Sequence, residues 1–308
     1  MKKALLLIFV LSSLSSPAQV PTNGLVAWYP FNGNANDESG NNNNGVVTGA
    51  VLTSDRFGNE NSAYNFRNNT DIIRIHNSTT INQNAVTDNY TVSFWYKTDT
   101  ENTPSDYYSV LIAKDGTPGY PYKFYHSVKD DSIFVSGSVY DFSSGIGSTA
   151  KFSYIKNSAW HQITFLVDQA RDTIFLYIDG GLKSKYVNTT AISGSNTWDL
   201  TIGNGWTGEK CFIGSIDDIR IYNRVLNKSE ISSLFNAGKY SEVVIDINIE
   251  GNDTVCAGQG SEYTVSVNTS ANKYLFRDTT AINTGGNGFF GLNMNYAYND
   301  ITNTFSYD

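Results

Sequence analysis

Residues 90–96 read Tyr-Thr-Val-Ser-Phe-Trp-Tyr, and this stretch decides the fold class. Side chains alternate across an extended chain, so Val92, Phe94 and Tyr96 share one face and the residues between them share the other. Runs rich in β-branched and aromatic residues are typical of strands. The stretch therefore predicts a β-strand, around which the rest of the chain can be interpreted.

Further strands separated by turns follow the same pattern. Asp179-Gly180 follows one of these runs directly and predicts a tight hairpin, because glycine supplies the positive φ that such a turn needs. Recurrent turns at this spacing are typical of a sandwich or jelly roll. The additional strand candidates are residues 163–167, 173–178, 201–203 and 212–222.

The composition agrees with an all-β chain and excludes one class of partner. The 308 residues include 20 Tyr and have an aromatic content of 14%, which favours strands. The 21 Lys and Arg are outnumbered by 29 Asp and Glu, giving a net charge of −8. Because nucleic-acid binding needs clustered basic residues, this balance argues against a nucleic-acid partner.

One helix is predicted near the end of the first module. Asn227 is a helix N-cap, and Glu230, three residues later, completes a capping box. Gly238 ends the helix. Its apolar stripe consists of Ile231, Leu234 and Phe235.

Residues 1–18 predict a signal peptide. Two lysines precede an apolar run at 4–11, and Ser16-Pro17-Ala18 has the pattern of a cleavage site. The alternative is an amphipathic helix of the mature fold, but the segment has no polar face. No later stretch approaches membrane-spanning length. We therefore expect a secreted or cell-surface protein that does not insert into the membrane.

Residues 241–308 predict a second, smaller β module with alternating residues at 243–249 and 263–267. An immunoglobulin-like sandwich needs about 100 residues, so we expect this module to be incomplete. Export permits a disulfide between Cys211 and Cys256, but the two cysteines lie in different modules. We expect Cys256 to be unpaired.

Three segments, taken in order, resemble the bacterial laminin-G-like, concanavalin-A-like jelly-roll family between residues 24 and 238. They are Gly-Leu-Val-Ala-Trp-Tyr-Pro-Phe at 24–31 with the Asn-rich loop after it, Trp-His-Gln-Ile at 160–163 with Tyr-Ile-Asp-Gly at 177–180, and Phe-Ile-Gly-Ser-Ile-Asp-Asp-Ile-Arg-Ile-Tyr at 212–222. The resemblance implies two packed antiparallel sheets, often a calcium ion, and a binding role. The expected fold is thus all-β: a two-sheet antiparallel jelly-roll sandwich at 24–238 with one short C-terminal helix, plus the small β-sandwich-like module. Residues 251–258 with the strand at 263 resemble the start of an Ig- or PKD-like repeat.

The residues do not favour catalysis. Related jelly rolls that hydrolyse glycans carry Glu-x-Asp-x-x-Glu on one strand, and this spacing is absent. Asp217 and Asp218 are adjacent and would face opposite sides of a strand. No Gly-x-Ser-x-Gly elbow accompanies the histidines. His161 is predicted to be structural.

A calcium site is predicted from oxygen-rich residues. The loop at 37–45 supplies the Asp37 carboxylate and the amide oxygens of Asn42 and Asn44, which are ligands that calcium prefers. The alternative is a solvated Asn-rich turn. Asp217 is expected to point inward as a fourth ligand, because it shares a strand face with two isoleucines. Its alternative role is a hydrogen-bonded acid that clamps loop amides.

Residues 104–126, which contain Gly and Pro, are predicted to be loops, and their aromatic side chains predict a ligand surface. Sugar rings stack on aromatic rings, and amide oxygens take their hydroxyls. Packing in the core is the alternative for each of these side chains. The predicted ligand-binding residues are Tyr107, Tyr108, Tyr122, Asn204 and Trp206.

The sequence thus predicts a secreted, non-catalytic recognition or adhesion module that binds carbohydrate or a cell-surface protein and holds a structural calcium ion. A structural spacer without a small ligand is the alternative. A glycoside hydrolase with unrecognised catalytic residues is the weaker one.

Overall fold

A computed structural model describes residues 20–83, 88–116, 119–141, 146–187, 197–205 and 211–238, together with five short strands beyond residue 245. The chain divides into two compact units, Met1–Ala237 and Gly238–Asp308. The predicted signal peptide at 1–18 lies outside the described residues. Each unit is described by itself.

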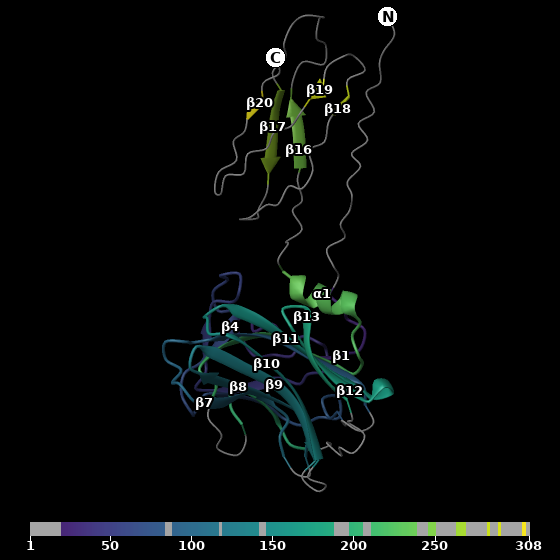
Figure 1. Cartoon of the computed structure of the whole chain (residues 1–308). Coiled ribbons are helices and arrows are strands. Elements are labelled where there is room, and N and C mark those ends of the chain that lie inside the picture. Colours follow the sequence, from purple (N-terminus) through teal and green to yellow (C-terminus); the bar gives the residue numbers. More distant parts are fainter. Residues whose placement is uncertain are drawn as a thin grey trace, which may run out of the picture. The chain divides into compact units, whose positions relative to one another are not determined.

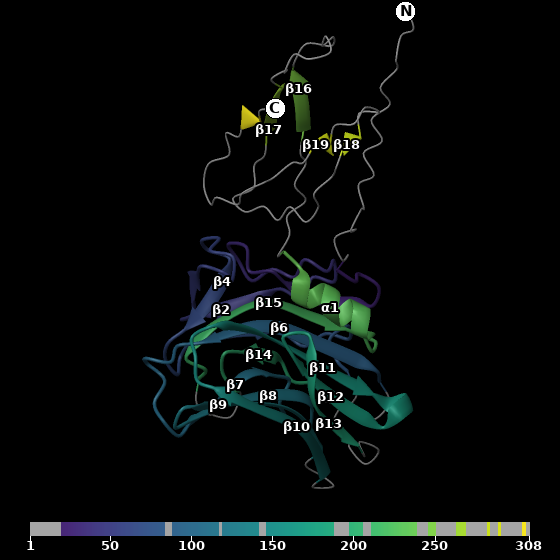
Figure 2. The same cartoon turned by 45° about the horizontal axis from the view of Figure 1, so that its top comes forward.

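The first unit is a sandwich of two antiparallel sheets (Figures 1 and 2). The eight-stranded sheet has the order β13-β12-β11-β6-β15-β4-β3, and β1 also pairs with β15. Its strands are β1 (Leu25–Tyr29), β3 (Val51–Thr53), β4 (Ala63–Phe66), β6 (Tyr90–Thr98), β11 (Trp160–Asp168), β12 (Thr173–Ile178), β13 (Gly181–Val187) and β15 (Gly214–Tyr222).

The seven-stranded sheet has the order β10-β9-β8-β7-β14-β5-β2. This arrangement confirms the predicted all-β, two-sheet architecture. The strands of this sheet are β2 (Gly45–Thr48), β5 (Ile72–Ile75), β7 (Tyr107–Ala113), β8 (Gly119–Lys129), β9 (Ser132–Asp141), β10 (Ile146–Ile155) and β14 (Leu200–Ile202).

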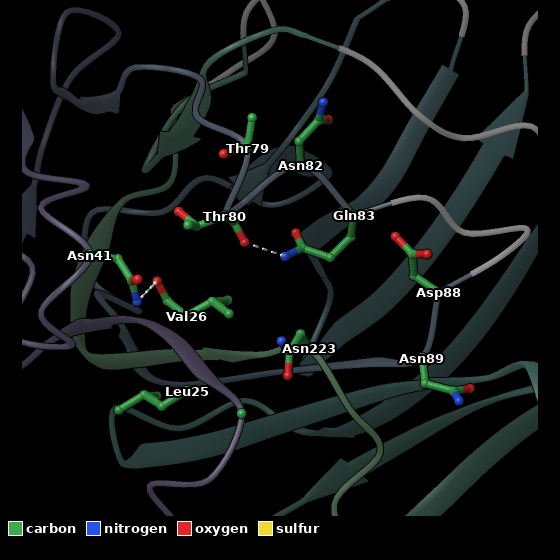
Figure 3. Close-up of a pocket in the computed structure, with 11 residues that line it drawn as sticks. Leu25, Val26, Asn41, Thr79, Thr80, Asn82, Gln83, Asp88, Asn89 and Asn223 are labelled. Atoms are coloured by element: carbon green, nitrogen blue, oxygen red, sulfur yellow. Dashed lines mark hydrogen bonds between the residues drawn. The ribbon is translucent and has the colours of Figure 1, made fainter.

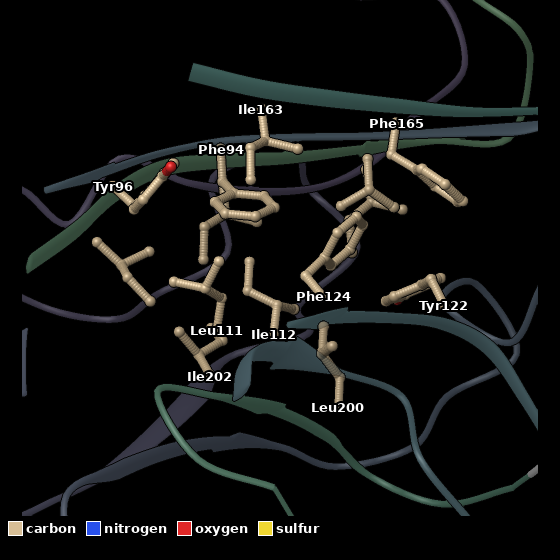
Figure 4. Packing of buried hydrophobic residues seen from close by; sticks show 14 of the residues in the cluster. Phe94, Tyr96, Leu111, Ile112, Tyr122, Phe124, Ile163, Phe165, Leu200 and Ile202 are labelled. Atoms are coloured by element: carbon tan, nitrogen blue, oxygen red, sulfur yellow. The ribbon is translucent and has the colours of Figure 1, made fainter. Parts of the chain in front are cut away.

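Aromatic side chains from both sheets meet in the core (Figure 4). Phe124 of β8 makes edge contacts with Phe94 at 5.1 Å and with Phe165 at 5.4 Å between ring centroids. The predicted alternation of residues 90–96 is confirmed, since Phe94 and Tyr96 belong to this core. Trp95, between them, faces the other side of its sheet.

The helix α1 (Lys228–Asn236) covers that other side (Figure 2). Both hydrogen bonds of the predicted capping box between Asn227 and Glu230 are present. Phe235 stacks on Trp95 with ring centroids 5.6 Å apart. The helix is therefore held by its cap at one end and by an aromatic stack near the other.

The predicted hairpin between β12 and β13 is present. Asp179 and Gly180 have φ values of 53° and 72°, so both central residues of the turn are left-handed. Ile178 and Gly181 pair directly across the turn. This geometry is that of a two-residue hairpin, which requires positive φ at both positions.

The region between residues 104 and 126, predicted to be loops, consists largely of strands β7 and β8. The glycines and prolines there suggested turns, but β8 has a register irregularity between Tyr120 and Lys123 that accommodates Pro121. Tyr122 consequently points into the core and is 0% exposed. Its predicted role as a surface ligand-binding residue is wrong.

The second unit contains two small described sheets. β16 (Asp246–Glu250), β17 (Tyr263–Asn268) and β20 (Thr304–Phe305) form one, and β18 (Ile282–Asn283) pairs with β19 (Phe289–Phe290). Cys256 lies outside the described residues, so the expectation that it is unpaired stays a prediction. Cys211 is a free, buried thiol in the first unit, and burial raises its pKa to about 12.

We expect Tyr122 to stabilise the fold through its ring and not through its hydroxyl. The buried hydroxyl has no hydrogen-bond partner among the described residues, and such a group costs stability. Tyr122→Phe should therefore be at least as stable as the parent, whereas Tyr122→Ala should lose about 3–5 kcal/mol of unfolding free energy. Urea unfolding of both variants measures this. A destabilised Tyr122→Phe would contradict the assignment.

Candidate functional site

The outer face of the seven-stranded sheet gathers aromatic side chains that are far apart in the sequence. Along β8, Phe124 enters the core while Lys123 and Tyr125 point the other way, since neighbouring side chains alternate. Pairing of β8 with β7 and β9 brings further rings beside them. We call this surface the tyrosine face; it comprises Tyr108, Tyr120, Lys123, Tyr125, Phe134 and Tyr140.

Two stacked pairs of rings form the tyrosine face. Tyr108 stacks on Tyr125 with centroids 5.0 Å apart and 29° between the planes. Tyr120 stacks on Tyr140 at 5.7 Å and 24°. Tyr108 is 49% exposed, so its ring is available to a ligand although it is already packed against Tyr125.

A buried ion pair lies beneath these rings. The ammonium group of Lys123 donates to the carboxylate of Asp115, and both residues are nearly inaccessible to solvent. The same ammonium group lies 5.6 Å from the ring centroid of Tyr120 and 5.2 Å from that of Tyr125, within cation–π range. Burial, followed by Tyr125, raises the pKa of Tyr120, which keeps its phenol neutral. The rings are thus held in place by interactions beneath them, so a ligand would lose little binding free energy to ordering these side chains.

The structure brings together only part of the predicted ligand set. Tyr108 belongs to the tyrosine face, whereas the hydroxyl of Tyr107 donates to the carbonyl of Cys211 at 3.0 Å. Asn204 is buried and its amide donates to the carbonyl of Asn69. Trp206 lies outside the described residues. Sequence reasoning missed Tyr140, because only the register of β8 against β9 places it opposite Tyr120.

The predicted calcium loop is closed by hydrogen bonds. Oδ1 of Asp37 accepts from the backbone N–H groups of Trp28 and Ser39, and Oδ2 accepts from both the backbone and side-chain amides of Asn43. Asn44 accepts the backbone N–H of Asp37 through Oδ1. Asn42 has a left-handed backbone with φ of 59° and lies exposed in the turn.

Asp217 does not face the core, which corrects the prediction. The pairing of β15 with β6 has an irregularity between Asp217 and Arg220, and Asp218 within it has φ of 49°. This bulge breaks the strict alternation that the prediction assumed. Asp217 is the partner of Trp95 in the register and shares its outward direction.

Both carboxylates of the bulge bind Arg56. The guanidinium donates to Asp217 at 2.8 Å and to Asp218 at 3.2 Å, and Arg220 donates to Asp218 at 2.5 Å. Burial raises the pKa of Asp217, with the charge of Asp218 adding to this effect. For Asp218, burial also favours a higher pKa, but the charges of Arg220 and Arg56 outweigh this effect. The pKa of Asp218 is therefore lowered.

These contacts do not fit a calcium ion shared by Asp37 and Asp217. A cation needs lone pairs that point at it, and N–H donors take those of Asp37 while Arg56 binds Asp217. Among the described residues, no three or more His, Cys, Asp or Glu gather as metal ligands. The calcium ion predicted from the sequence is thus not supported by the contacts of Asp37 and Asp217, and the measurement below tests it.

Two of the three described histidines, His126 and His161, have structural surroundings, whereas the side chain of His76 is exposed, with Nδ1 3.3 Å from the carboxylate of Asp199. His126 is 0% exposed, with Nε2 2.9 Å from the hydroxyl of Thr98 and Nδ1 3.4 Å from that of Ser109. No substrate reaches this serine–histidine pair without unfolding the core. His161 binds Asp179 at 2.8 Å and Asn157 at 3.1 Å, beside the hairpin turn.

Comparison with known proteins shows the family to which the chain belongs. The family described as the Concanavalin A-like lectin/glucanases superfamily, Laminin_G_3, matches residues 67–232, more than half of the chain. The chain belongs to this superfamily. The superfamily match spans β5 to α1 and so contains every strand of the tyrosine face.

Relatives of this Laminin_G_3 chain include toxin domains. Paraclostridial mosquitocidal protein 1 of Paraclostridium bifermentans is 28% identical over 219 residues, which cover 68% of this chain but only 17% of that protein. The solved binding domain of Paraclostridial Mosquitocidal Protein 1 has a TM-score of 0.58 at 18% identity, covering 87% of this chain and 73% of that one. The binding domain of botulinum neurotoxin serotype D has a TM-score of 0.58 at 18% identity, covering 76% and 56%. At 18% identity these two solved structures show a common fold.

Within the described part of the chain, no helix combines the length and the apolar character needed to cross a membrane.

The hydrogen bonds of Asp37 predict how the Laminin_G_3 domain responds to calcium. A bound ion would raise the thermal midpoint by mass action. Because N–H donors surround the carboxylate of Asp37, we expect equal midpoints in calcium and in chelator. Calorimetry in the two buffers measures this. A higher midpoint in calcium that Asp37→Ala abolishes would establish the site predicted from the sequence.

His126 predicts a loss of stability in acid. Burial lowers its pKa to about 3, whereas the unfolded chain protonates near pH 6.5. The unfolded state thus binds more protons between these values, and stability falls as the pH falls, by about 1.4 kcal/mol per pH unit. His126→Gln should remove this contribution from urea-unfolding curves recorded between pH 6 and 4. His161→Gln, at a more accessible site, is the control, and a parent-like pH slope in His126→Gln would contradict the assignment.

Proposed function

We propose that this chain is a secreted or cell-surface recognition module that binds carbohydrate on the tyrosine face. The observation that carries the proposal is the exposed Tyr108 ring, stacked on Tyr125 above the buried Lys123–Asp115 pair. Secretion is supported by the N-terminal segment of two lysines, a short apolar run and a small-residue cleavage pattern.

The chemistry of the tyrosine face suits a sugar ring. A sugar presents C–H groups that pack on an aromatic plane, while its hydroxyls need hydrogen-bond partners. Ser127 pairs with Tyr108 across β7 and β8, and Ser136 pairs with Tyr125 across β8 and β9, so hydroxyl side chains lie beside the rings. The positive charge of Lys123 is balanced by Asp115, which removes any strong preference for anionic ligands.

A cell-surface protein is the second candidate partner. The binding domain of botulinum neurotoxin DC, solved in complex with rat synaptotagmin II, has a TM-score of 0.57 at 14% identity, covering 80% of this chain and 63% of that one. At this identity the likeness supports a common fold and leaves the partner to be tested. The exposed Phe134 on the same face supplies apolar area that a protein partner would also bury.

Replacing Tyr108 with alanine should weaken glycan binding without unfolding the domain. The loss of one stacking ring corresponds to about 1.4 kcal/mol, or tenfold in affinity. A glycan array identifies the ligand, and calorimetry measures its affinity for each variant.

Tyr186→Ala is the matched control, because Tyr186 is 45% exposed but lies on β13 of the other sheet. It should bind as the parent does. Equal affinity of Tyr108→Ala and the parent would overturn the tyrosine face as the site. A parent that binds no glycan on the array would favour a spacer or a protein-binding module.

A further inference from the structure

Three neighbouring strands of the seven-stranded sheet bring an amine, an amide and a carboxylate together at their ends. β14 lies between β5 and β7 and pairs with both. Lys114 directly follows β7, Asn77 is the second residue after β5, and Asp199 directly precedes β14. The antiparallel pairing therefore places the three residues at the same edge of the sheet, although 37 and 85 positions of sequence separate them.

The amine of Lys114 is in direct contact with the amide of Asn77. Lys114 is 0% exposed, and its Nζ donates to Oδ1 of Asn77 at 2.8 Å and to the carbonyl of Trp198 at 2.6 Å. The ring of Trp198 packs on Gly116, where a Cβ atom would come to 2.1 Å from it. Because Oδ1 is bonded directly to Cγ, the hydrogen bond brings the amine close to the carbon that a nucleophile attacks.

The backbone that carries the amide is also held in place. Oδ1 of Asp199 accepts the backbone N–H of Asn77 at 2.9 Å. In the loop after Asn77, Nε2 of Gln83 donates to the carbonyl of Thr80 at 3.2 Å (Figure 3). The hydroxyl of Thr80 donates to Oδ1 of Asn43 at 3.1 Å. The amide is therefore kept against the amine by the folded chain on both sides.

The surroundings of Lys114 favour the reactive form of its amine. Burial lowers the pKa of Lys114 to about 8, although the charge of Asp199 opposes this effect. A lysine amine is nucleophilic only when it is neutral, and a pKa near 8 leaves about one amine in ten neutral at pH 7. Attack of an amine on an amide is slow in water, but fixed positioning can correspond to effective concentrations of about 10⁵–10⁸ M.

We propose that Lys114 and Asn77 join in an intramolecular isopeptide bond once the domain has folded. The neutral Nζ attacks Cγ of Asn77, one amine proton moves to Nδ2, and the Cγ–Nδ2 bond breaks with release of ammonia. The released ammonia takes up the proton that the ammonium group lost beforehand. One C–N bond replaces another, so no electrons are transferred and no further reactant is consumed. Asn77 is partly exposed, which gives the ammonia a way out.

The bond would tie the ends of β5 and β7 together across β14. It would close the chain between residues 77 and 114 into a loop, and a covalent link of this kind restricts the unfolded chain as a disulfide does. Residues 24–238 contain a single cysteine, Cys211, so no disulfide can form within this domain. Neither Lys114 nor Asn77 belongs to the tyrosine face, so the inference does not depend on the function proposed there.

Mass spectrometry of the purified full chain tests the proposal. We expect the intact chain to be lighter than its sequence by one molecule of ammonia. A tryptic digest should contain a branched peptide in which residues 75–97 are joined to residues 98–123, because trypsin does not cleave after an acylated Lys114. A cyclised Asn-Gly pair also loses ammonia but leaves linear peptides, so the branched peptide is the decisive readout.

Three variants locate the bond. Lys114→Met removes the nucleophile and Asn77→Ser removes the amide, so each should have the full sequence mass and yield only linear peptides from this region. Lys151→Met is the control, because it changes an exposed lysine on β10 and should keep the branched peptide. The digest of the parent chain decides the outcome even if a variant does not fold. Linear peptides alone in the parent, or a branch at another lysine such as the buried Lys123, overturn the proposal.

Discussion

The alternation of side chains along β8 determines both the core and the candidate binding surface. Phe124 points inward and contacts Phe94 and Phe165 of the opposite sheet. Its neighbours Lys123 and Tyr125 must therefore point outward. A shift of one residue would bury the ammonium group in the core and expose Phe124, so burial of the aromatic side fixes the register. The tyrosine face is a consequence of that register. The buried ammonium group of Lys123 is neutralised by its ion pair with Asp115 beneath the rings.

The bulge of β15 has a comparable role on the opposite sheet. The left-handed backbone of Asp218 lets two adjacent carboxylates reach one guanidinium, that of Arg56. Arg56 also donates to the carbonyl of Ala237 at the end of α1 and lies 4.6 Å from the ring centroid of Trp95. The loop that carries Arg56, the bulge and the helix are thus joined through buried charges. Removing one partner would leave an uncompensated charge, which costs more than the pair contributes.

The parts of the structure that follow from local rules could be predicted from the sequence. The capping box of Asn227 and Glu230, the hairpin at Asp179-Gly180 and the strand at 90–96 depend on neighbouring residues, and all three are confirmed. The predicted inward direction of Asp217 was wrong, because a bulge depends on the strand that pairs with β15 and not on the sequence of β15 alone. The predicted surface position of Tyr122 was also wrong. Pro and Gly around it suggested a loop, whereas an irregular position in the strand accommodates Pro121 and Tyr122 is buried.

The candidate binding surface could not be predicted from the sequence for a different reason. Tyr108, Tyr125 and Tyr140 lie on three strands, and no spacing in the sequence reveals that they become neighbours. What the sequence did show was the kind of chemistry. Its polar residues are mainly Asn, Ser and Thr, with only 16% charged residues. A surface built from such groups and tyrosine rings suits the carbohydrate ligand that we propose, because stacking and hydrogen bonding would contribute more to binding than long-range charge.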